Sequence, residues 1–369
     1  MEFPDRTKEL NSSGYYDTHY LKSKESAEDT MEIGPIKGLV LIGGGDILLE
    51  LCRWARGEFL DVLVITSPRH AEEKMPSGLD LRLSLSEIEI SFIETDDIDS
   101  HAVSNFLSET DDWLFLSIGA AWIFKDSTIK KLFRNELLNV HGSRLPTNRG
   151  GGGFSWQIMM GNRFGFSLIH RVNGGIDTGP IKAYEEYLFP HSCRKPVDFE
   201  IVYKMKSLEF IKMFISKVRA DVCSYPEIEQ LEYLSTYWPR LNTDINGWIN
   251  WNWAGTEIER FILAFDDPYV GALTTYNGEP VNLKSVHLSS QDALFHPFQS
   301  GIVYRVSKSW ICVAVPGGAI IVESVVNQNG VSLLNTIKPG DRFMTPSTYL
   351  DESFSRVAYT PDGLRTYRS

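Results

Sequence analysis

From Lys37 onward, the chain alternates short apolar runs with amphipathic stretches. Residues 38–43 and 61–66 are apolar enough for buried strands, and residues 47–55 between them have helical spacing. The same pattern continues with expected strands over 88–93 and 113–119 and an expected helix over 101–107. This alternation predicts an α/β domain with a mostly parallel sheet covered by helices.

Two polar side chains, Asn139 and His141, stand at the end of a further apolar run. On a strand, a spacing of two residues sends both side chains to the same face. Ligands of such sheets gather at the carboxyl ends of the strands, where this pair is expected. Asp177 follows between Gly175 and Gly179, a setting typical of a tight turn that carries a carboxylate.

Each of these residues also has a structural interpretation. A lone histidine is more often a packed or surface residue than a catalyst, Asn139 could cap a strand end, and Asp177 could simply form its turn. Their order and spacing together favour a single catalytic site.

The segment 139–150 resembles a pattern of the formyltransferases that use 10-formyltetrahydrofolate. That pattern runs Asn-x-His-x-Ser-Leu-Leu-Pro-x-x-Arg-Gly and is closed by Asp-x-Gly, here residues 177–179. Arg144 replaces the first leucine of the family, and a triple glycine at 151–153 replaces Ala-Ala-Pro or Met-Asn-Pro. These departures spare the catalytic positions and lie in a loop that borders the acceptor pocket in relatives.

The resemblance implies transfer of a formyl group from a folate nitrogen to an amine through a tetrahedral oxyanion. Asn139 would stabilise the oxyanion, and His141 would be the general base. Asp177 would orient His141 and relay a proton to the leaving nitrogen.

The resemblance also implies two sets of binding residues. Contacts to the N10-formyltetrahydrofolate donor are expected from Ile118, Gly119, Ser143, Arg144, Leu145, Pro146, Asn173, Gly174, Gly175 and Ile176. Contacts to the acceptor are expected from Arg149, Gly151, Gly152 and Trp156. Trp156 could stack on a base or sugar, or it could be a core aromatic on the helix that follows the glycine loop.

The organisation downstream of the motif predicts a second, smaller domain. After an amphipathic helix over 198–222, a helix over 255–264 is followed by short strands separated by turns, which is typical of a small β-barrel. The order resembles the OB-like carboxyl-terminal barrel of methionyl-tRNA formyltransferase and of amino-sugar formyltransferases. The expected units are a tail (1–35), a Rossmann-like catalytic domain (36–222), a linker (223–244), the barrel (245–335) and an extension (336–369).

Charge bears on the choice of acceptor. The chain has a net charge of −12, and residues 241–369 hold 12 acidic and 9 basic side chains. A barrel that grips tRNA should carry a positive face. We therefore expect a nucleotide-linked amino sugar of a bacterial surface-glycan pathway as the acceptor, with methionyl-tRNA as the alternative. The glycinamide ribonucleotide enzyme is disfavoured because it normally ends without a barrel.

Two other classes of function are weaker. A glycine turn at 43–45 suggests a dinucleotide site, but Leu48 stands where the fingerprint needs a third glycine or alanine. A catalytically silent binding module would have no physical need to keep Asn139, His141 and Asp177. We expect no metal, because the cysteines lack metal-type spacing, and no disulfide. A cytoplasmic protein is expected, since no apolar run suits a signal peptide or a membrane span; relatives suggest a homodimer.

Overall fold

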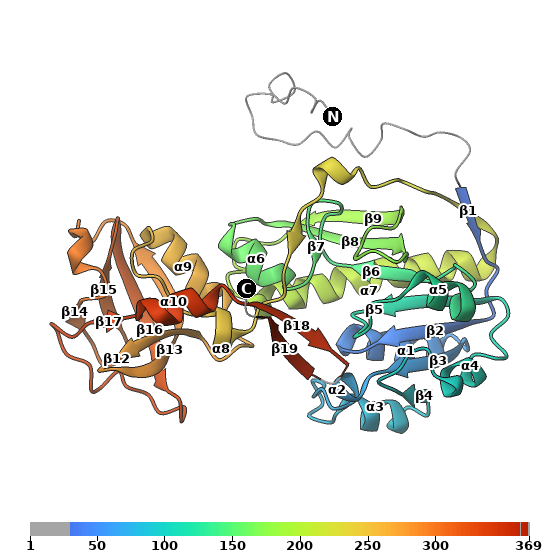
Figure 1. Cartoon of the computed structure of the whole chain (residues 1–369), viewed down its shortest axis with the longest axis horizontal. Coiled ribbons are helices and arrows are strands. Elements are labelled where there is room, and N and C mark those ends of the chain that lie inside the picture. The colour runs from blue at the N-terminus through green and yellow to red at the C-terminus, as the bar shows by residue number, and fades with distance from the viewer. Residues whose placement is uncertain (1–29, 362, 368–369) are drawn as a thin grey trace, which may run out of the picture.

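The computed structural model of the chain describes residues 30–361 and 363–367 (Figure 1). The predicted tail therefore lies largely outside the described residues. An α/β domain and a smaller antiparallel barrel stand side by side in Figure 1, as the sequence predicted. Within the described residues, no helix is both long and apolar enough to cross a membrane.

The α/β domain is built on a seven-stranded sheet of the described residues, in the order β4-β3-β2-β5-β6-β8-β9. Neighbouring strands from β4 to β6 pair in parallel, whereas β8 and β9 pair antiparallel. The mostly parallel sheet confirms the prediction from the alternating pattern. The strands are β2 (Gly38–Gly43), β3 (Asp61–Thr66), β4 (Ser91–Glu94), β5 (Trp113–Ile118), β6 (Leu138–His141), β8 (Phe164–Arg171) and β9 (Ile181–Leu188).

Helices cover both faces of this sheet because successive strand residues point to opposite sides. Leu39 and Leu41 pack toward α1, α3 and α7, while Val40 and Ile42 pack toward α4 and α5. The helices are α1 (Asp46–Gly57), α2 (Pro68–Ala71), α3 (Leu81–Glu87), α4 (His101–Phe106), α5 (Asp126–Phe133), α6 (Gly153–Met159) and α7 (Pro196–Ala220).

The strand expected over 88–93 begins later, at Ser91. Ile88 caps the end of α3, Glu89 takes a positive φ of 52°, and Ile90 N–H donates to the Leu85 carbonyl. Residues 88–90 therefore form the turn that closes the helix, although two of them are apolar.

Short strands from the predicted tail and linker belong to the catalytic domain. β1 (Thr30–Ile33) pairs antiparallel with β10 (Cys223–Pro226). After the 3-10 turn η3 (Glu232–Leu234), β11 (Tyr237–Trp238) pairs in parallel with β7 (Arg149–Gly150) of the glycine loop. The linker is thus bound to the loop that follows the catalytic motif.

The second domain is a six-stranded antiparallel sheet of described residues that curls around α9 in the order β14-β15-β16-β13-β12-β17. A bridge between Ile302 and Arg342 joins its two ends, and Phe343 N–H donates to the Gly301 carbonyl. The barrel thereby includes residues beyond 335. Its elements are α8 (Thr243–Asn246), α9 (Gly255–Ala264), β12 (Ala272–Tyr276), β13 (Glu279–Ser289), η4 (Pro297–Gln299), β14 (Val303–Val306), β15 (Ile311–Val315), β16 (Gly318–Asn327) and β17 (Phe343–Met344).

The extension returns toward the catalytic domain. It forms α10 (Ser347–Ser353) and the hairpin β18 (Arg356–Thr360) and β19 (Gly363–Tyr367), drawn in red between the two domains in Figure 1. Tyr349 stacks on Trp248 at 4.3 Å between ring centroids, and Asn246 Nδ2 donates to the Ser353 carbonyl at 2.7 Å. These contacts fix the base of the extension to α8.

A buried ion pair fastens the linker to β9. The Lys182 side chain is fully buried and pairs with Glu227, which also accepts from Arg171 at 3.0 Å. Removing one partner of a buried pair leaves an uncompensated charge. We predict that Glu227→Ala lowers the free energy of unfolding by about 3–5 kcal/mol in urea titrations. Glu87→Ala, at an exposed position of α3, is the control, and its free energy of unfolding should stay within about 0.5 kcal/mol of wild type. Equal destabilisation by the two substitutions would contradict a stabilising role of the ion pair.

Candidate active site

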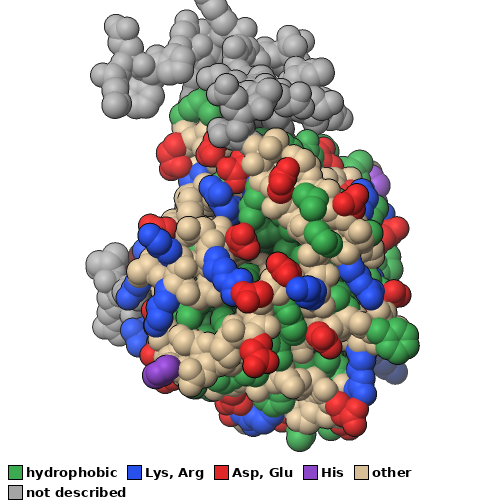
Figure 2. Space-filling model, turned by 90° about the vertical axis from the view of Figure 1, so that its right-hand side faces the viewer, with side chains coloured by type: hydrophobic (Ala, Val, Ile, Leu, Met, Phe, Trp, Pro, Cys, Tyr) green, Lys and Arg blue, Asp and Glu red, His purple; other side chains and the backbone are tan. Residues whose placement is uncertain are grey.

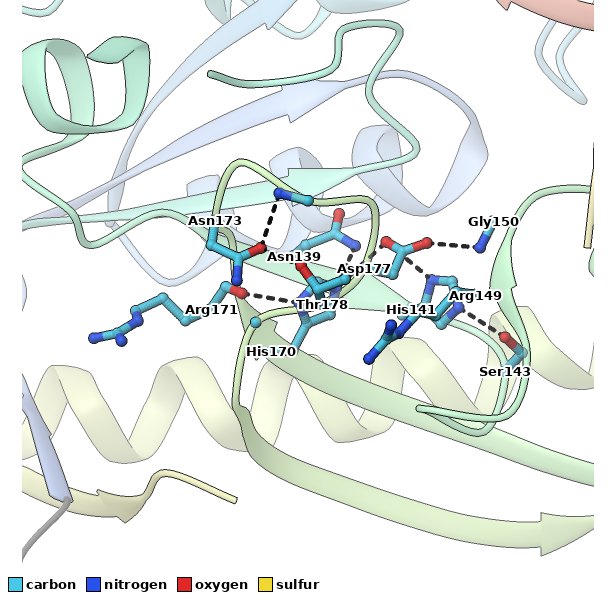
Figure 3. A network of polar contacts seen from close by, with 12 residues as sticks. Asn139, His141, Ser143, Arg149, Gly150, His170, Arg171, Asn173, Asp177 and Thr178 are labelled. Atoms are coloured by element: carbon cyan, nitrogen blue, oxygen red, sulfur yellow. Dashed lines mark hydrogen bonds and ion pairs between the residues drawn. The ribbon is translucent and has the colours of Figure 1, made fainter. Parts of the chain in front are cut away.

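The candidate site lies where β6 ends at the carboxyl edge of the sheet (Figure 3). Leu138 and Val140 are buried in the sheet, whereas Asn139 and His141 are half-buried on its other side. β6 pairs with β8 so that Asn139 stands opposite His170. Asn139 Nδ2 lies 3.0 Å from His170 Nε2.

Asp177 completes the group from the turn between β8 and β9. Its φ of 53° is left-handed, a conformation that Asp tolerates better than most residues. One carboxylate oxygen, Oδ2, accepts from Gly150 N–H at 2.9 Å. The other, Oδ1, lies 3.8 Å from His141 Nδ1 and 3.6 Å from His170 Nε2. One carboxylate therefore faces two imidazoles, as Figure 3 shows.

The linker holds both the Asp177 turn and the glycine loop in place. Gln230 Nε2 donates to the Asp177 carbonyl at 2.9 Å and to the Gly179 carbonyl at 2.7 Å. Gly150 has a φ of 98°, and a Cβ there would meet the Trp238 carbonyl oxygen at 2.4 Å. Only glycine allows the loop to approach β11 this closely, so the Gly150 N–H can reach Asp177.

A chain of hydrogen bonds sets the tautomer of His141. Ser143 Oγ donates to the Asn148 carbonyl at 2.7 Å, so it accepts from His141 Nε2, which is also 2.7 Å away. We assign the proton of the neutral ring to Nε2 on this network. The lone pair of Nδ1 then faces the side of the site where Asp177 lies.

Burial and nearby charges set the protonation states of His141 and Asp177. Burial lowers the pKa of His141, the Asp177 carboxylate opposes that effect, and His170 lowers the pKa further. Burial alone would raise the pKa of Asp177, but His141, His170 and the Gly150 N–H together hold it well below its usual range. At neutral pH the site thus combines a neutral imidazole with an ionised carboxylate.

His170 extends the network to the end of β8. The Asn139 amide can only donate through Nδ2, so His170 Nε2 accepts, and the ring proton on Nδ1 donates to the Arg171 carbonyl at 3.0 Å. An amide nitrogen carries two N–H groups, so binding His170 leaves Asn139 a further donor.

His141, His170 and Asp177 are, among the described residues, a group that could hold a metal ion, with ligand atoms within 4.8 Å of one another. Hydrogen bonds engage two of the polar atoms of this group: His170 Nε2 accepts from Asn139, and Asp177 Oδ2 accepts from Gly150. The lone pair of His141 Nδ1 faces Asp177 Oδ1 across 3.8 Å.

The residues expected to contact the folate donor fall into an open and a buried set. Gly119 and the stretch 174–176 are exposed beside Asp177, and Ile176 keeps 39% of its surface in solvent. The Arg144 guanidinium lies over the Phe166 ring at 5.9 Å. The side chains of the remaining expected residues are buried or hydrogen-bonded to the protein; these residues are Ile118, Ser143, Leu145, Pro146 and Asn173. Asn173, for example, accepts a hydrogen bond from Thr178 Oγ1 at 2.5 Å. A ligand would meet the buried positions chiefly through the backbone.

The residues expected to contact the acceptor surround the glycine loop. Arg149 is buried, and its guanidinium binds Gln230 at 3.1 Å and Glu232 at 2.7 Å. Trp156 Nε1 donates to the Pro239 carbonyl at 2.8 Å, and its ring lines a hollow between the domains. Gly151 and Gly152 lie against the linker. The structure thus gives Arg149 two protein partners, whereas the Trp156 ring stacks on Trp238 at 6.4 Å between centroids and borders the hollow.

Sequence reasoning missed two residues of the site, His170 and Gln230. His170 carried a usable signal, because it is a polar residue in an apolar strand that adjoins the motif. Gln230 carried none, since nothing in the linker sequence shows which side chain reaches the Asp177 turn.

Sequence comparisons connect the chain to formyltransferases. Residues 243–335 match the model for the formyl transferase C-terminal domain. Methionyl-tRNA formyltransferase of Acetivibrio thermocellus is 26% identical over 190 residues, which cover 51% of this chain and 58% of the relative. The enzyme of Syntrophus aciditrophicus is 27% identical over 194 residues, 52% of this chain and 59% of the relative. The match thus spans little more than half the length of these curated relatives.

Solved structures share the fold. WlaRD, described as a sugar 3N-formyltransferase in the presence of dTDP and 5-N-formyl-THF, has a TM-score of 0.58 at 18% identity and covers 80% of this chain and 99% of its own. An N-formyltransferase from Helicobacter canadensis, in complex with folinic acid and dTDP-3-aminofucose, has a TM-score of 0.59 at 18% identity and covers 79% and 99%. The sequence matches confirm the predicted resemblance to formyltransferases, and these structures show that the fold is shared.

The opposing effects on His141 give a pH prediction. We expect its imidazole to titrate below the ordinary value of 6.5 in the wild type, because burial disfavours the charged ring. Asp177→Asn should lower this pKa further, because it removes the carboxylate that raises it. NMR titration of ¹⁵N-labelled histidines measures both values, with exposed His296 as the control that should not move. A rise in the His141 pKa on substitution would contradict the geometry.

Proposed function

We propose that this chain, a member of the formyltransferase family, transfers a formyl group from N10-formyltetrahydrofolate to the amino group of a nucleotide-linked amino sugar. The observation that carries the proposal is the convergence of an amide donor, a neutral imidazole and an ionised carboxylate at one edge of the sheet. We assign the enzyme to the cytoplasmic stage of bacterial surface-glycan synthesis.

The residues beside Asp177 suit a formyl folate. Exposed glycines at 119, 174 and 175 leave room for a flat ring, and the exposed Ile176 offers apolar contact. Backbone pairing sets Ile118 beside Val140, so Gly119 lies next to His141 across the sheet. When bound, the donor supplies a formyl carbon attached to a nitrogen that can leave.

The site residues divide the work of transfer among them. The Asn139 amide donates to the formyl oxygen as that oxygen gains negative charge. His141 Nδ1 accepts the proton that the acceptor amine loses while the new C–N bond forms. The Asp177 carboxylate, 3.8 Å from Nδ1, stabilises the charged ring until the proton passes to the leaving folate nitrogen.

Two observations support an amino sugar nucleotide as the acceptor: the charge of the barrel and the ligands of similar solved structures. WlaRD is a sugar 3N-formyltransferase by description, and the N-formyltransferase of Helicobacter canadensis is in complex with dTDP-3-aminofucose. Residues 241–369 carry 12 acidic and 9 basic side chains. On the α/β domain, the face that Figure 2 shows also has acidic and basic side chains intermixed. A tRNA-binding barrel calls for a positive face. Methionyl-tRNA remains the second candidate, because the curated sequence relatives carry that name.

The first prediction of this mechanism concerns its three residues. Asn139→Ala, His141→Ala and Asp177→Ala should each lower kcat by about 100-fold or more while the protein stays folded. Single-turnover assays with the formyl donor and thermal melting measure the two properties. Asn105→Ala and His101→Ala, at exposed positions of α4, are matched controls that should retain activity. Near wild-type turnover of a site variant would remove that residue from the mechanism.

The second prediction concerns the acceptor. A screen of nucleotide-linked amino sugars with N10-formyltetrahydrofolate should give a product heavier by one formyl group for at least one of them, read by mass spectrometry. Methionyl-tRNA, included in the same screen, should be a poor acceptor. Efficient formylation of methionyl-tRNA with none of any amino sugar would overturn the proposal.

A further inference from the structure

The turn after β3 holds buried polar atoms that the catalytic group does not use. Thr66 and His70 expose 0% and 5% of their surface. Within the described part of the chain, Thr66 Oγ1 and His70 Nδ1 are buried without a hydrogen-bond partner. Buried polar groups are nearly always paired, so two such atoms in one turn indicate a place where a ligand completes the bonding.

The unpaired His70 atom is a donor. Arg69 Nη2 lies 2.8 Å from His70 Nε2, and a guanidinium can only donate, so Nε2 accepts. Burial, followed by the charges of Arg69 and Arg240, lowers the pKa of His70 to about 3. The ring is neutral at pH 7, and its single proton is on Nδ1. A buried N–H beside two guanidinium groups suits an anionic oxygen.

Arg240 reaches this turn from the linker. A Cβ at position 151 would lie 2.3 Å from Arg240 Cγ, so the arginine side chain crosses directly over the glycine loop. Burial raises the pKa of Glu73, which forms an ion pair with Arg69 at 3.0 Å, and the positive charge of Arg240 opposes that rise. The positive charges of two arginines from separate segments therefore act on one carboxylate.

Arg240 stands between the catalytic group and the hollow at the domain junction. Gly151, under Arg240, follows Gly150, whose N–H binds Asp177. Arg240 also lines a hollow of about 690 Å³ together with the aromatic rings of Trp156 and Tyr237. The catalytic group, the Arg240 guanidinium and the aromatic hollow thus follow one another in the same order as the amino sugar, the diphosphate and the nucleoside of the acceptor.

We propose that Arg69, His70 and Arg240 bind the diphosphate of the nucleotide-linked acceptor. Its nucleoside occupies the hollow beside Trp156 and Tyr237, where a base stacks on an aromatic ring. Gly151, part of the triple glycine that departs from the family pattern, allows Arg240 to lie over the loop, because a side chain at position 151 would displace Arg240. The inference rests on the proposed function and assigns the acceptor's anionic part to residues outside the catalytic group.

Binding measurements on the full chain test the inference without catalysis. Isothermal titration calorimetry with dTDP, UDP and GDP identifies the nucleoside diphosphate that wild type binds most tightly. Arg240→Gln and Arg69→Gln should each weaken its binding about tenfold or more, as expected for loss of a charge-assisted hydrogen bond. Arg69 does not line the hollow, so Arg69→Gln should leave binding of the matching nucleoside unchanged. Gly151→Ala keeps both arginines and should weaken the diphosphate similarly. Arg53→Gln, on α1, is the matched control.

The outcomes separate this inference from the proposed function. Three results would overturn the site: unchanged diphosphate affinity in both arginine variants, equal weakening of diphosphate and nucleoside in Arg69→Gln, or no binding of any diphosphate by wild type. Arginine-dependent binding together with failure of every amino sugar in the acceptor screen would leave the site standing and overturn the proposed function. In steady-state assays, both arginine variants should raise the acceptor KM with kcat nearly unchanged.

Discussion

The carboxylate of Asp177 is the interaction on which the site depends. It is mostly buried, and a buried carboxylate is costly unless hydrogen bonds and charges compensate it. The Gly150 N–H supplies one bond at 2.9 Å, and the imidazoles of His141 and His170 lie within 3.8 Å. Satisfying this one group brings together β6, β8, the turn after β8 and the glycine loop. The same carboxylate raises the pKa of His141 against the effect of burial. One side chain therefore both holds these segments together and adjusts the basicity of the proposed general base.

The linker between the domains holds the loops of the candidate site in place. β11 pairs with the glycine loop, Gln230 holds the Asp177 turn, and Arg240 crosses Gly151 toward the turn after β3. The buried pair of Lys182 and Glu227 fixes the start of this segment on the sheet. A segment with little regular structure therefore positions both the reacting groups and the proposed binding site for the acceptor.

The sequence predicted what depends on periodicity and local chemistry. β2, β3 and α9 follow from apolar spacing, and the tight turn that carries Asp177 follows from its glycines. The left-handed φ of Asp177 itself was not predicted. The sequence also did not predict β7 and β11, because strands of two residues have no period, nor the antiparallel partner that places His170 beside Asn139. The tautomer of His141 depends on Ser143 and the Asn148 carbonyl, and such a network is visible only once the loop is folded.

A double-mutant cycle on Asp177 and His141 tests the central claim most directly. If Asp177 acts through His141, kcat/KM for formyl transfer should fall steeply in Asp177→Asn and in His141→Gln, and the double variant should be within about threefold of the slower single variant. Losses that multiply in the double variant would show that the two residues act independently, and would contradict the account.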